Sequence, residues 1–337
     1  MNARSLLSLL FHGEKALDLV GTAHRLGLFA SLEAGPITLR ELASRLAVRP
    51  LRLYKMLDAL ESLELVVRRQ PTDELLDAQY RAAEPLTAAV EAVLGARSIE
   101  RDRNDNYPWR EIYGRLPDVL AGRLDARFAW PPRSDIDLRA FERSMAAGCP
   151  PIIEALTALS PSIFDESRTR WLDVGGGDGT VAVGVLSNAT VPCDVHCDVF
   201  NLPATESLVR ERASAAGLAH RVGFVGGDFF KDPLPQGYDV LSFIRVLHDW
   251  PADVARQLLT AARDALPPGG KLFICEEFRN PDRLAVQFFW TYFLIGVDAC
   301  VSRLREVAWY GQALGELGFG KVAIVPGAFD VIVATRD

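Results

Sequence analysis

The stretch RWLDVGGGDGT, Arg170–Thr180, decides the fold class of this chain. It joins a short apolar strand to a run of glycines, an acid, a further glycine and a small polar residue. A glycine-rich turn directly after a strand indicates that the backbone must approach a ligand closely. The motifs that follow it along the chain indicate which ligand that is.

From Arg170 onward, strand-like and helix-like segments alternate along the chain. The predicted strands are 170–174, 193–199, 221–225, 238–244, 270–276, 321–326 and 329–335. Such alternation predicts parallel βαβ units in an open, doubly wound sheet. The last two strands are joined only by Gly327 and Ala328 or so, which is too short for a crossover, so they should form an antiparallel hairpin.

The first half of the chain has helical periodicity and one recognisable pattern. A capping box, TLRE at 38–41, opens one helix, a second helix follows, and a β-hairpin is expected around 71–73. Helix, turn, helix and hairpin form a winged-helix arrangement. DNA binding is one interpretation of this domain, because its second helix carries Arg49, Arg52 and Lys55. The other interpretation is that the domain serves for dimerisation and covers an active site.

Length and composition limit the possible functions. The 337 residues favour two domains, and 37 basic against 44 acidic residues give a net charge of −7, which argues against nucleic-acid binding. The apolar run 284–299 is short for a membrane span and contains Gln287 and Asp298, so we expect a buried helix. Without a secretory signal, the protein is expected in the cytoplasm. Cys193 and Cys197 fit a strand better than a zinc site, and no metal is predicted.

The spacing of the glycines bears on the ligand. Gly175, Gly177 and Gly179 are followed by Thr180, where a dinucleotide fingerprint has its third glycine. The carboxylate of Asp173 is unfavourable beside a pyrophosphate but suits a cationic nucleoside such as S-adenosylmethionine (SAM). The alternative is a tight turn in which Asp173 caps the next helix.

Polar residues after the next two strands support a nucleoside site. Asp198, or Asn201 three residues later, could hold the hydroxyls of a ribose. Asp228 could accept a hydrogen bond from an adenine amine while Phe229 lies against the ring. The carboxyl ends of successive strands are where open α/β sheets bind ligands.

The motifs LDVGGGDG, NLPA, GDFFKDPLP, RVLHDW and LPPGGKL together resemble the class I O-methyltransferases of the plant caffeic acid type and their bacterial natural-product relatives. The resemblance covers nearly the whole chain. It implies a winged-helix-like dimerisation domain at 1–100, a helical linker with the substrate pocket at 101–165, and a Rossmann-like, SAM-binding methyltransferase domain at 166–337. A homodimer through the first domain is expected. The expected cofactor-binding residues are Asp173, Gly175, Gly176, Gly177, Asp198, Asn201, Leu202, Gly227, Asp228, Phe229, Phe243 and Arg245.

His248 is the candidate base among five histidines. It follows the fourth predicted strand, and Asp249 beside it and Glu276 at the end of the fifth strand could orient an imidazole. In the family that the chain resembles, this histidine is the base and the acid ending the next strand assists it. The catalytic residues expected are therefore His248, Asp249 and Glu276.

The chain departs from the family at two positions. The family's ribose-binding acid precedes Leu-Pro, where this chain has Asn201, so that either Asn201 or Asp198 takes that role. A second family glutamate that contacts the histidine is replaced by Leu304, although Arg305 matches the arginine that follows it. Either His248 works with Glu276 alone, or the acceptor is acidic enough to need little help.

Apolar side chains of two helices are expected to receive the acceptor between the domains. The candidates are Phe141, Met145, Cys149, Phe289, Trp290, Phe293 and Leu294. Plain core packing is the alternative for each of them. A flat, apolar pocket suits an aromatic secondary metabolite.

O-methylation of a hydroxyl on a small aromatic molecule is thus the leading hypothesis. N- or C-methylation stays open because nothing in the sequence fixes the acceptor atom. Some relatives of the resembled family use bound SAM in hydroxylation or pericyclic chemistry, and the loss of the family glutamate at Leu304 is compatible with that. A winged-helix regulator that senses a ligand is a further alternative.

Overall fold

The computed structural model describes residues 6–7, 10–69, 75–94, 118, 120–121, 123, 132, 134–164, 169–279, 304–327 and 329–337. The chain divides into two compact units, Met1–Asp105 and Asn106–Asp337. The division after Asp105 falls inside the region 101–165 that is expected as linker, and most of that region belongs to the second unit. Each unit has its own hydrophobic core.

The first unit has the winged-helix pattern. Its elements are α2 (Gly13–Arg25), α3 (Leu28–Glu33), β1 (Ile37–Thr38), α4 (Leu39–Arg45), α5 (Pro50–Ser62), β2 (Val66–Arg69), η1 (Leu75–Asp77), β3 (Gln79–Ala82) and α6 (Thr87–Leu94). The strands form an antiparallel sheet in the order β1-β3-β2. The capping box is confirmed, because Thr38 and Glu41 each accept a hydrogen bond from the other's backbone N–H. The expected turn at 71–73 lies outside the described residues.

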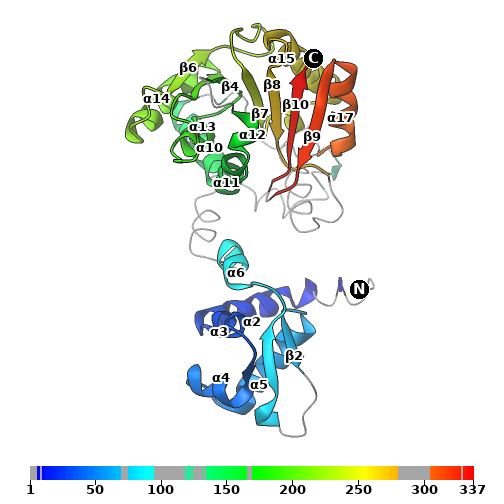
Figure 1. The fold of residues 1–337 in the computed structure, drawn as a ribbon. Coiled ribbons are helices and arrows are strands. Elements are labelled where there is room, and N and C mark those ends of the chain that lie inside the picture. Colours follow the sequence, from blue (N-terminus) through cyan, green and yellow to red (C-terminus); the bar gives the residue numbers. More distant parts are fainter. Residues whose placement is uncertain are drawn as a thin grey trace. The chain divides into compact units, whose positions relative to one another are not determined.

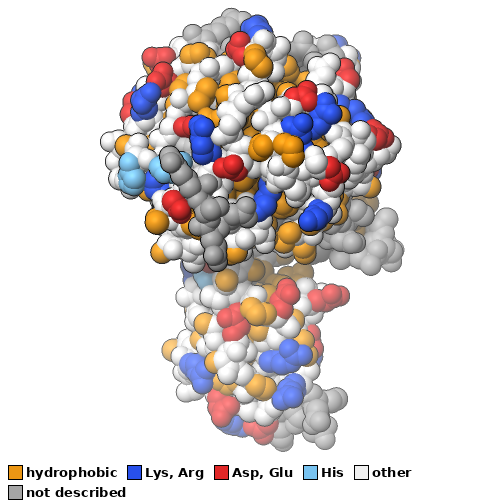
Figure 2. Space-filling model, turned by 45° about the horizontal axis from the view of Figure 1, so that its top comes forward, with side chains coloured by type: hydrophobic (Ala, Val, Ile, Leu, Met, Phe, Trp, Pro, Cys, Tyr) orange, Lys and Arg blue, Asp and Glu red, His pale blue; other side chains and the backbone are white. Residues whose placement is uncertain are grey.

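The surface of this unit bears on the DNA-binding interpretation. Arg49, Arg52 and Lys55 are exposed, as solvated residues on a helix face usually are. Among the described residues on the face shown in Figure 2, basic and acidic side chains are interspersed. This distribution, like the net charge of −7, is unlike the basic stripe of a nucleic-acid-binding protein.

The second unit is a sheet covered by helices. Before the sheet come α10 (Asp135–Ala147), α11 (Pro150–Ala158) and α12 (Ser160–Ile163). The sheet and its connections comprise β4 (Arg170–Val174), α13 (Thr180–Leu186), β5 (His196–Asn201), η2 (Pro203–Thr205), α14 (Glu206–Ala215), β6 (Val222–Gly226), β7 (Val240–Ile244), η3 (Leu247–Asp249), α15 (Ala252–Ala265), β8 (Lys271–Cys275), α17 (Val307–Glu316), β9 (Phe319–Val325) and β10 (Val331–Arg336).

The seven strands lie in the order β6-β5-β4-β7-β8-β10-β9 (Figure 1). Strands β4 to β8 are parallel, and β10 is antiparallel to both β8 and β9. The predicted doubly wound sheet with an antiparallel hairpin at its end is therefore confirmed. Because the chain order reverses between β4 and β7, the sheet has a switch point there, where such folds bind ligands.

Two apolar layers hold the sheet between helices. In β4, Trp171 joins the core beneath α11, α13 and α14, whereas Leu172 and Val174 join the core beneath α15 and α17. This alternation follows from the two-residue period of a strand. With both faces covered, the carboxyl edge of the sheet is the part left for a ligand. Among the described residues, none of the helices has the length and hydropathy needed to cross a bilayer.

Candidate active site

The glycine turn after β4 depends on the absence of side chains. Gly175 and Gly177 have φ angles of +75° and +57°, in the left-handed region that favours glycine. A Cβ on Gly175 would lie 2.8 Å from Val246 Cγ2, and one on Gly177 would lie 2.6 Å from Glu142 Oε2. The turn is therefore packed between the segment after β7 and helix α10.

Asp173 is a fully buried acid beneath this turn. The indole Nε1–H of Trp171 donates to Ser242 Oγ at 2.8 Å, and Ser242 Oγ–H donates to Asp173 Oδ1 at 2.7 Å. Asp173 Oδ2 has no hydrogen-bond partner in the part of the chain that the structure describes. It lies where a side chain on Gly176 would be. Burial raises the pKa of Asp173 to about 7, although the Ser242 hydrogen bond opposes this.

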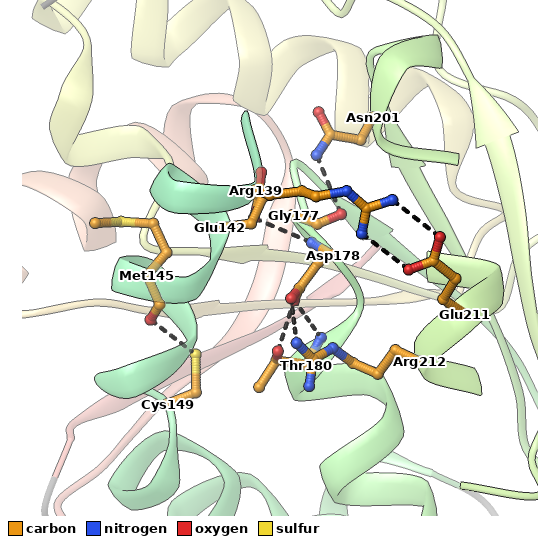
Figure 3. A network of polar contacts seen from close by, with 10 residues as sticks. All are labelled: Arg139, Glu142, Met145, Cys149, Gly177, Asp178, Thr180, Asn201, Glu211 and Arg212. Atoms are coloured by element: carbon orange, nitrogen blue, oxygen red, sulfur yellow. Dashed lines mark hydrogen bonds and ion pairs between the residues drawn. The ribbon is translucent and has the colours of Figure 1, made fainter. Parts of the chain in front are cut away.

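Asp178, rather than Asp173, supports the start of the next helix. Its Oδ1 accepts hydrogen bonds from the backbone N–H of Thr180 at 3.1 Å and from Thr180 Oγ1 at 2.6 Å. Its Oδ2 pairs with Arg212 of α14 (Figure 3). Since Asp173 bonds to Ser242 instead, the alternative in which Asp173 caps this helix does not hold.

The structure separates the two candidates for ribose binding. Asn201 ends β5, and its Nδ2 lies 3.4 Å from the carbonyl oxygen of Gly177 in the turn. Asp198 lies within β5, where its Oδ2 accepts from Tyr238 Oη at 2.8 Å and lies 3.8 Å from Arg170, the first residue of β4. Asp198 thus faces the amino end of the neighbouring strand. The predicted strand ended at residue 199, whereas β5 continues to Asn201, which explains the difference.

The residues after β6 combine an acid with aromatic rings. Asp228 is partly exposed, and its carboxylate accepts from Phe230 N at 3.0 Å and from Lys231 Nζ at 2.7 Å. These two hydrogen bonds lower the pKa of Asp228. Phe229 lies 6.1 Å from Trp250, centroid to centroid, in an edge-on arrangement. Its ring also borders Gly175, so the segment after β6 reaches the turn.

Three further predicted cofactor residues lie nearby in the fold. Leu202 directly follows β5, and its N–H donates to Asn201 Oδ1 at 2.8 Å. Gly227 has no room for a side chain, because a Cβ there would lie 2.6 Å from the ring of Phe200. Phe243 is fully buried in the core beneath α15 and α17.

Arg245 follows β7 with a φ of +56°, unusual for a residue other than glycine. Its Nη1 donates to the carbonyl oxygen of Met145 at 3.1 Å, and its Nη2 lies 3.2 Å from Met145 Sδ. The side chain therefore ties α10 to the carboxyl end of β7. Non-glycine residues in this region tend to occur at functional sites.

His248 lies in η3, two residues after Val246, which contacts the turn. Its side chain is 3% exposed. Nδ1 lies 3.6 Å from Glu276 Oε2, and Nε2 lies 3.4 Å from Asp249 Oδ1. Burial, together with Arg245 and Arg305, lowers the pKa of His248 to about 3. The imidazole is therefore neutral at physiological pH, and one nitrogen of a neutral imidazole carries a lone pair that can accept a proton.

Glu276 directly follows β8 and is fully buried. Its Oε2 accepts from the backbone N–H of His248 at 3.2 Å, and its Oε1 accepts from the hydroxyl of Tyr310 in α17. Burial raises the pKa of Glu276 to about 7, and the hydrogen bond from Tyr310 opposes that rise. Glu276 is thus held by two donors and faces Nδ1 of His248.

Arg305 fixes the backbone that carries His248. It is buried, and its Nη1 donates to the carbonyl oxygen of Leu247 at 2.8 Å. Its Nη2 donates to the carbonyl oxygen of Trp250. The neighbouring Leu304, at the position of the family glutamate, is buried and apolar.

The predicted acceptor residues fall into three groups. Phe141 and Met145 are half-buried on α10. Cys149 is a buried member of the core beneath α11 and α13, and burial raises the pKa of its thiol to about 11. Phe289, Trp290, Phe293 and Leu294 lie outside the described residues.

Sequence reasoning missed the side chains that complete the site. Ser242 carried a signal, because it is the one polar residue in the strand VLSFI and pairs in register with Asp173. No sequence signal pointed to Tyr310 or Glu142, because each reaches the site from a helix that is distant in sequence. Arg305 was matched to a family arginine, but its contacts could not be foreseen.

Comparisons with known proteins agree with this geometry. Residues 97–318 match a family model described as an O-methyltransferase domain. The chain is 32% identical over 331 residues to the N,N-dimethyltransferase OxyT of Streptomyces rimosus, covering 94% of this chain and 90% of that protein. It is 31% identical over 268 residues to the 3-hydroxy-5-methyl-1-naphthoate 3-O-methyltransferase of Streptomyces sahachiroi, covering 76% and 72%.

A solved structure shows the same fold. The SAM-dependent methyltransferase SibL, in its apo form, superposes with a TM-score of 0.64 at 24% identity, covering 98% of this chain and 99% of that one. The family model covers well over half of the chain, and both sequence relatives match over most of their length. The chain therefore belongs to the O-methyltransferase family and is a SAM-dependent methyltransferase of small molecules.

Proposed function

We propose that this enzyme methylates a hydroxyl group on a small aromatic secondary metabolite, with His248 as the general base. The observation that carries the proposal is the buried pair of His248 and Glu276 at the carboxyl edge of the sheet. It lies two residues from Val246, which packs on the glycine turn. A base beside the cofactor site is what transfer to a protonated acceptor requires.

The residues of the turn fit SAM, which supplies a methyl group on a positively charged sulfur for in-line displacement. The left-handed glycines leave a backbone cradle. Beneath it, Asp173 Oδ2 is a buried acceptor without a hydrogen-bond partner among the described residues. Both features suit a cationic ligand. Gly175, Gly176 and Gly177 would hold its methionine half.

The nucleoside half would be held by residues after β5 and β6. Asn201, which touches the turn, would bind the ribose, and Leu202 beside it would border the sugar. Asp228 keeps lone pairs for the adenine amine after its two hydrogen bonds, and Phe229 would lie against the ring. Asp198, engaged with Tyr238, is left out of this proposal.

His248 would take the proton of the acceptor through Nε2, because Nδ1 faces Glu276. An ionised Glu276 would stabilise the imidazolium that forms, which offsets the burial that disfavours it. Asp249 is about half exposed and lies 3.4 Å from Nε2, so it would lie on the solvent side of the base. Phe141 and Met145 on α10 would border the acceptor, and Arg245 fixes that helix.

N-methylation is the second candidate, and two observations favour it. One relative is named as an N,N-dimethyltransferase. The pKa of His248 is lowered to about 3, which makes it a weak base, and a neutral amine attacks without losing a proton first. C-methylation has weaker support, because a relative at only 24% identity is named as a bacteriochlorophyllide d C-20 methyltransferase. No observation in the site favours C-methylation or SAM-dependent chemistry without methyl transfer. The homodimer and the cytoplasmic location stay predictions.

A methyl-transfer assay distinguishes these functions. Labelled SAM is offered with a panel of phenols, amines and keto acids to the wild type and to His248→Ala. We expect label in phenols, and a loss of about 10²- to 10⁴-fold in His248→Ala. Label in amines alone would favour N-methylation, and SAM binding without transfer to any acceptor would contradict methylation.

A further inference from the structure

Glu142 is an acid in an unexpected place. It lies on α10 and is 4% exposed, and its Oε2 accepts a hydrogen bond from the backbone N–H of Asp178 at 3.1 Å (Figure 3). The same oxygen occupies the space beside the Cα of Gly177, where a side chain would be. The carboxylate therefore reaches from a helix onto the glycine turn.

The charges around the turn are unevenly compensated. Asp178 is neutralised by Arg212 and accepts two further hydrogen bonds from Thr180. Glu142 forms no ion pair with any residue that the structure describes. A buried carboxylate without an ion-pair partner is unfavourable. Burial and the neighbouring Asp178 therefore raise the pKa of Glu142 to about 7, although the Asp178 N–H, Arg212 and Arg245 oppose this rise. A neutral residue would serve the fold better, which points to a cationic ligand.

We propose that Glu142 binds the α-ammonium group in the methionine half of SAM. This rests on the proposed position of SAM at the glycine turn. SAM has two cations, but only the ammonium donates hydrogen bonds, and Glu142 has accepted only one of the roughly four that a carboxylate can accept. The partner of the ammonium is then an ionised side chain on α10 in addition to the backbone of the turn.

The proposal makes cofactor affinity depend on pH. The charged groups facing Glu142 are Asp178 of the turn, Arg212 of α14 and Arg245 after β7. Arg139, one turn earlier on α10, is engaged with Glu211. The ammonium binds only the ionised acid, so binding below pH 7 displaces a proton from Glu142. The affinity for the cofactor should therefore rise between pH 6 and pH 7.5. The ammonium group stays protonated over this range, because its pKa is about 8.

Two ligands separate the ammonium from the rest of the cofactor. S-adenosylhomocysteine carries the ammonium without the sulfonium charge, and 5′-methylthioadenosine carries neither. Their binding to the wild type, Glu142→Gln and Glu211→Gln is measured by calorimetry in buffers of different ionisation enthalpy. Gln at 142 can still accept from Asp178 N–H, and Glu211→Gln breaks a surface ion pair of α10 without touching the turn.

In Glu142→Gln we expect the affinity for S-adenosylhomocysteine to fall at least about tenfold, and the affinity for methylthioadenosine to change less than twofold. The proton released from this site on binding should disappear. Glu142→Asp, which keeps the charge, should restore part of the affinity, and Glu211→Gln should match the wild type.

Unchanged binding of S-adenosylhomocysteine by Glu142→Gln would overturn the proposal, and so would an equal loss for both ligands, which indicates a structural role. A wild type that binds neither ligand would instead overturn the position of SAM at the turn, and with it this inference.

Discussion

Tyr310→Phe tests how Glu276 supports the base. The substitution removes only the hydroxyl that donates to Glu276 Oε1, and both side chains are fully buried. Loss of a hydrogen bond to a buried charged acceptor costs about 1.5–3 kcal/mol, which corresponds to about 1–2 pH units. The hydroxyl favours the ionised acid, so its loss raises the pKa of Glu276 above the wild-type value of about 7. If ionised Glu276 supports His248, the acid limb of the rate profile moves to higher pH.

The assay is kcat/KM against pH, with the acceptor that the panel identifies. We expect the acid limb to move up by about 1–2 pH units in Tyr310→Phe, with a smaller change on the plateau. Tyr238→Phe is the matched control, because Tyr238 donates to Asp198 at 2.8 Å at the other end of the strands, and its profile should equal that of the wild type. An acid limb in Tyr310→Phe that stays where the wild type has it would refute the role of Glu276.

Three further predictions concern the turn and its acids. Gly177→Ala should destabilise the protein by about 1–2 kcal/mol and abolish tight SAM binding, because φ is +57° and the new Cβ meets Glu142. The control Gly237→Ala (φ +87°) should lower only the melting temperature, and equal SAM affinity in both variants would contradict this prediction. The melting temperature of the ligand-free protein should fall as the pH rises from 5.5 to 7 and then level off. Glu142, Asp173 and Glu276 have folded-state pKa values raised to about 7, so the stability that each contributes below its unfolded pKa is lost as the pH rises towards 7, by roughly 2 kcal/mol each above pH 5.5; a rise in melting temperature would contradict this. Asp173→Asn should raise the melting temperature at pH 8 by about 5 °C or more and weaken SAM binding, which thermal melts and calorimetry measure. Tighter SAM binding would argue against Asp173 as a partner of the cation.

The fold could be predicted because its signals are local. Strands covered on both faces, such as β7 and β8, are nearly continuous apolar runs, and a two-residue connection excludes a crossover. Strand ends were harder to predict. A difference of two residues at the end of β5 separates Asp198, which lies within the sheet, from Asn201, which reaches the turn.

The site could be predicted only where its residues follow strands in the sequence. Glu276 comes directly after β8 and His248 follows the end of β7 by four residues, so their meeting at the carboxyl edge follows from parallel pairing. Tyr310 and Glu142 reach the same edge from helices, at sequence separations of 34 and 36 residues from their partners. Their positions depend on how α17 and α10 pack, which a single sequence does not reveal. The replacement of the family glutamate by Leu304 indicated that His248 has one carboxylate partner fewer. The sequence did not indicate that Tyr310 donates a hydrogen bond to the remaining acid, Glu276.

The central claim is that His248 removes the proton of the acceptor, and a series of phenols of increasing acidity tests it most directly. Methyl transfer to each phenol is compared between the wild type and His248→Ala at one pH. We predict a loss of about 10²- to 10⁴-fold for the least acidic phenols, which shrinks towards none for phenols that are already ionised. The same loss for every phenol, or no loss for any, would contradict the role of His248 as the base.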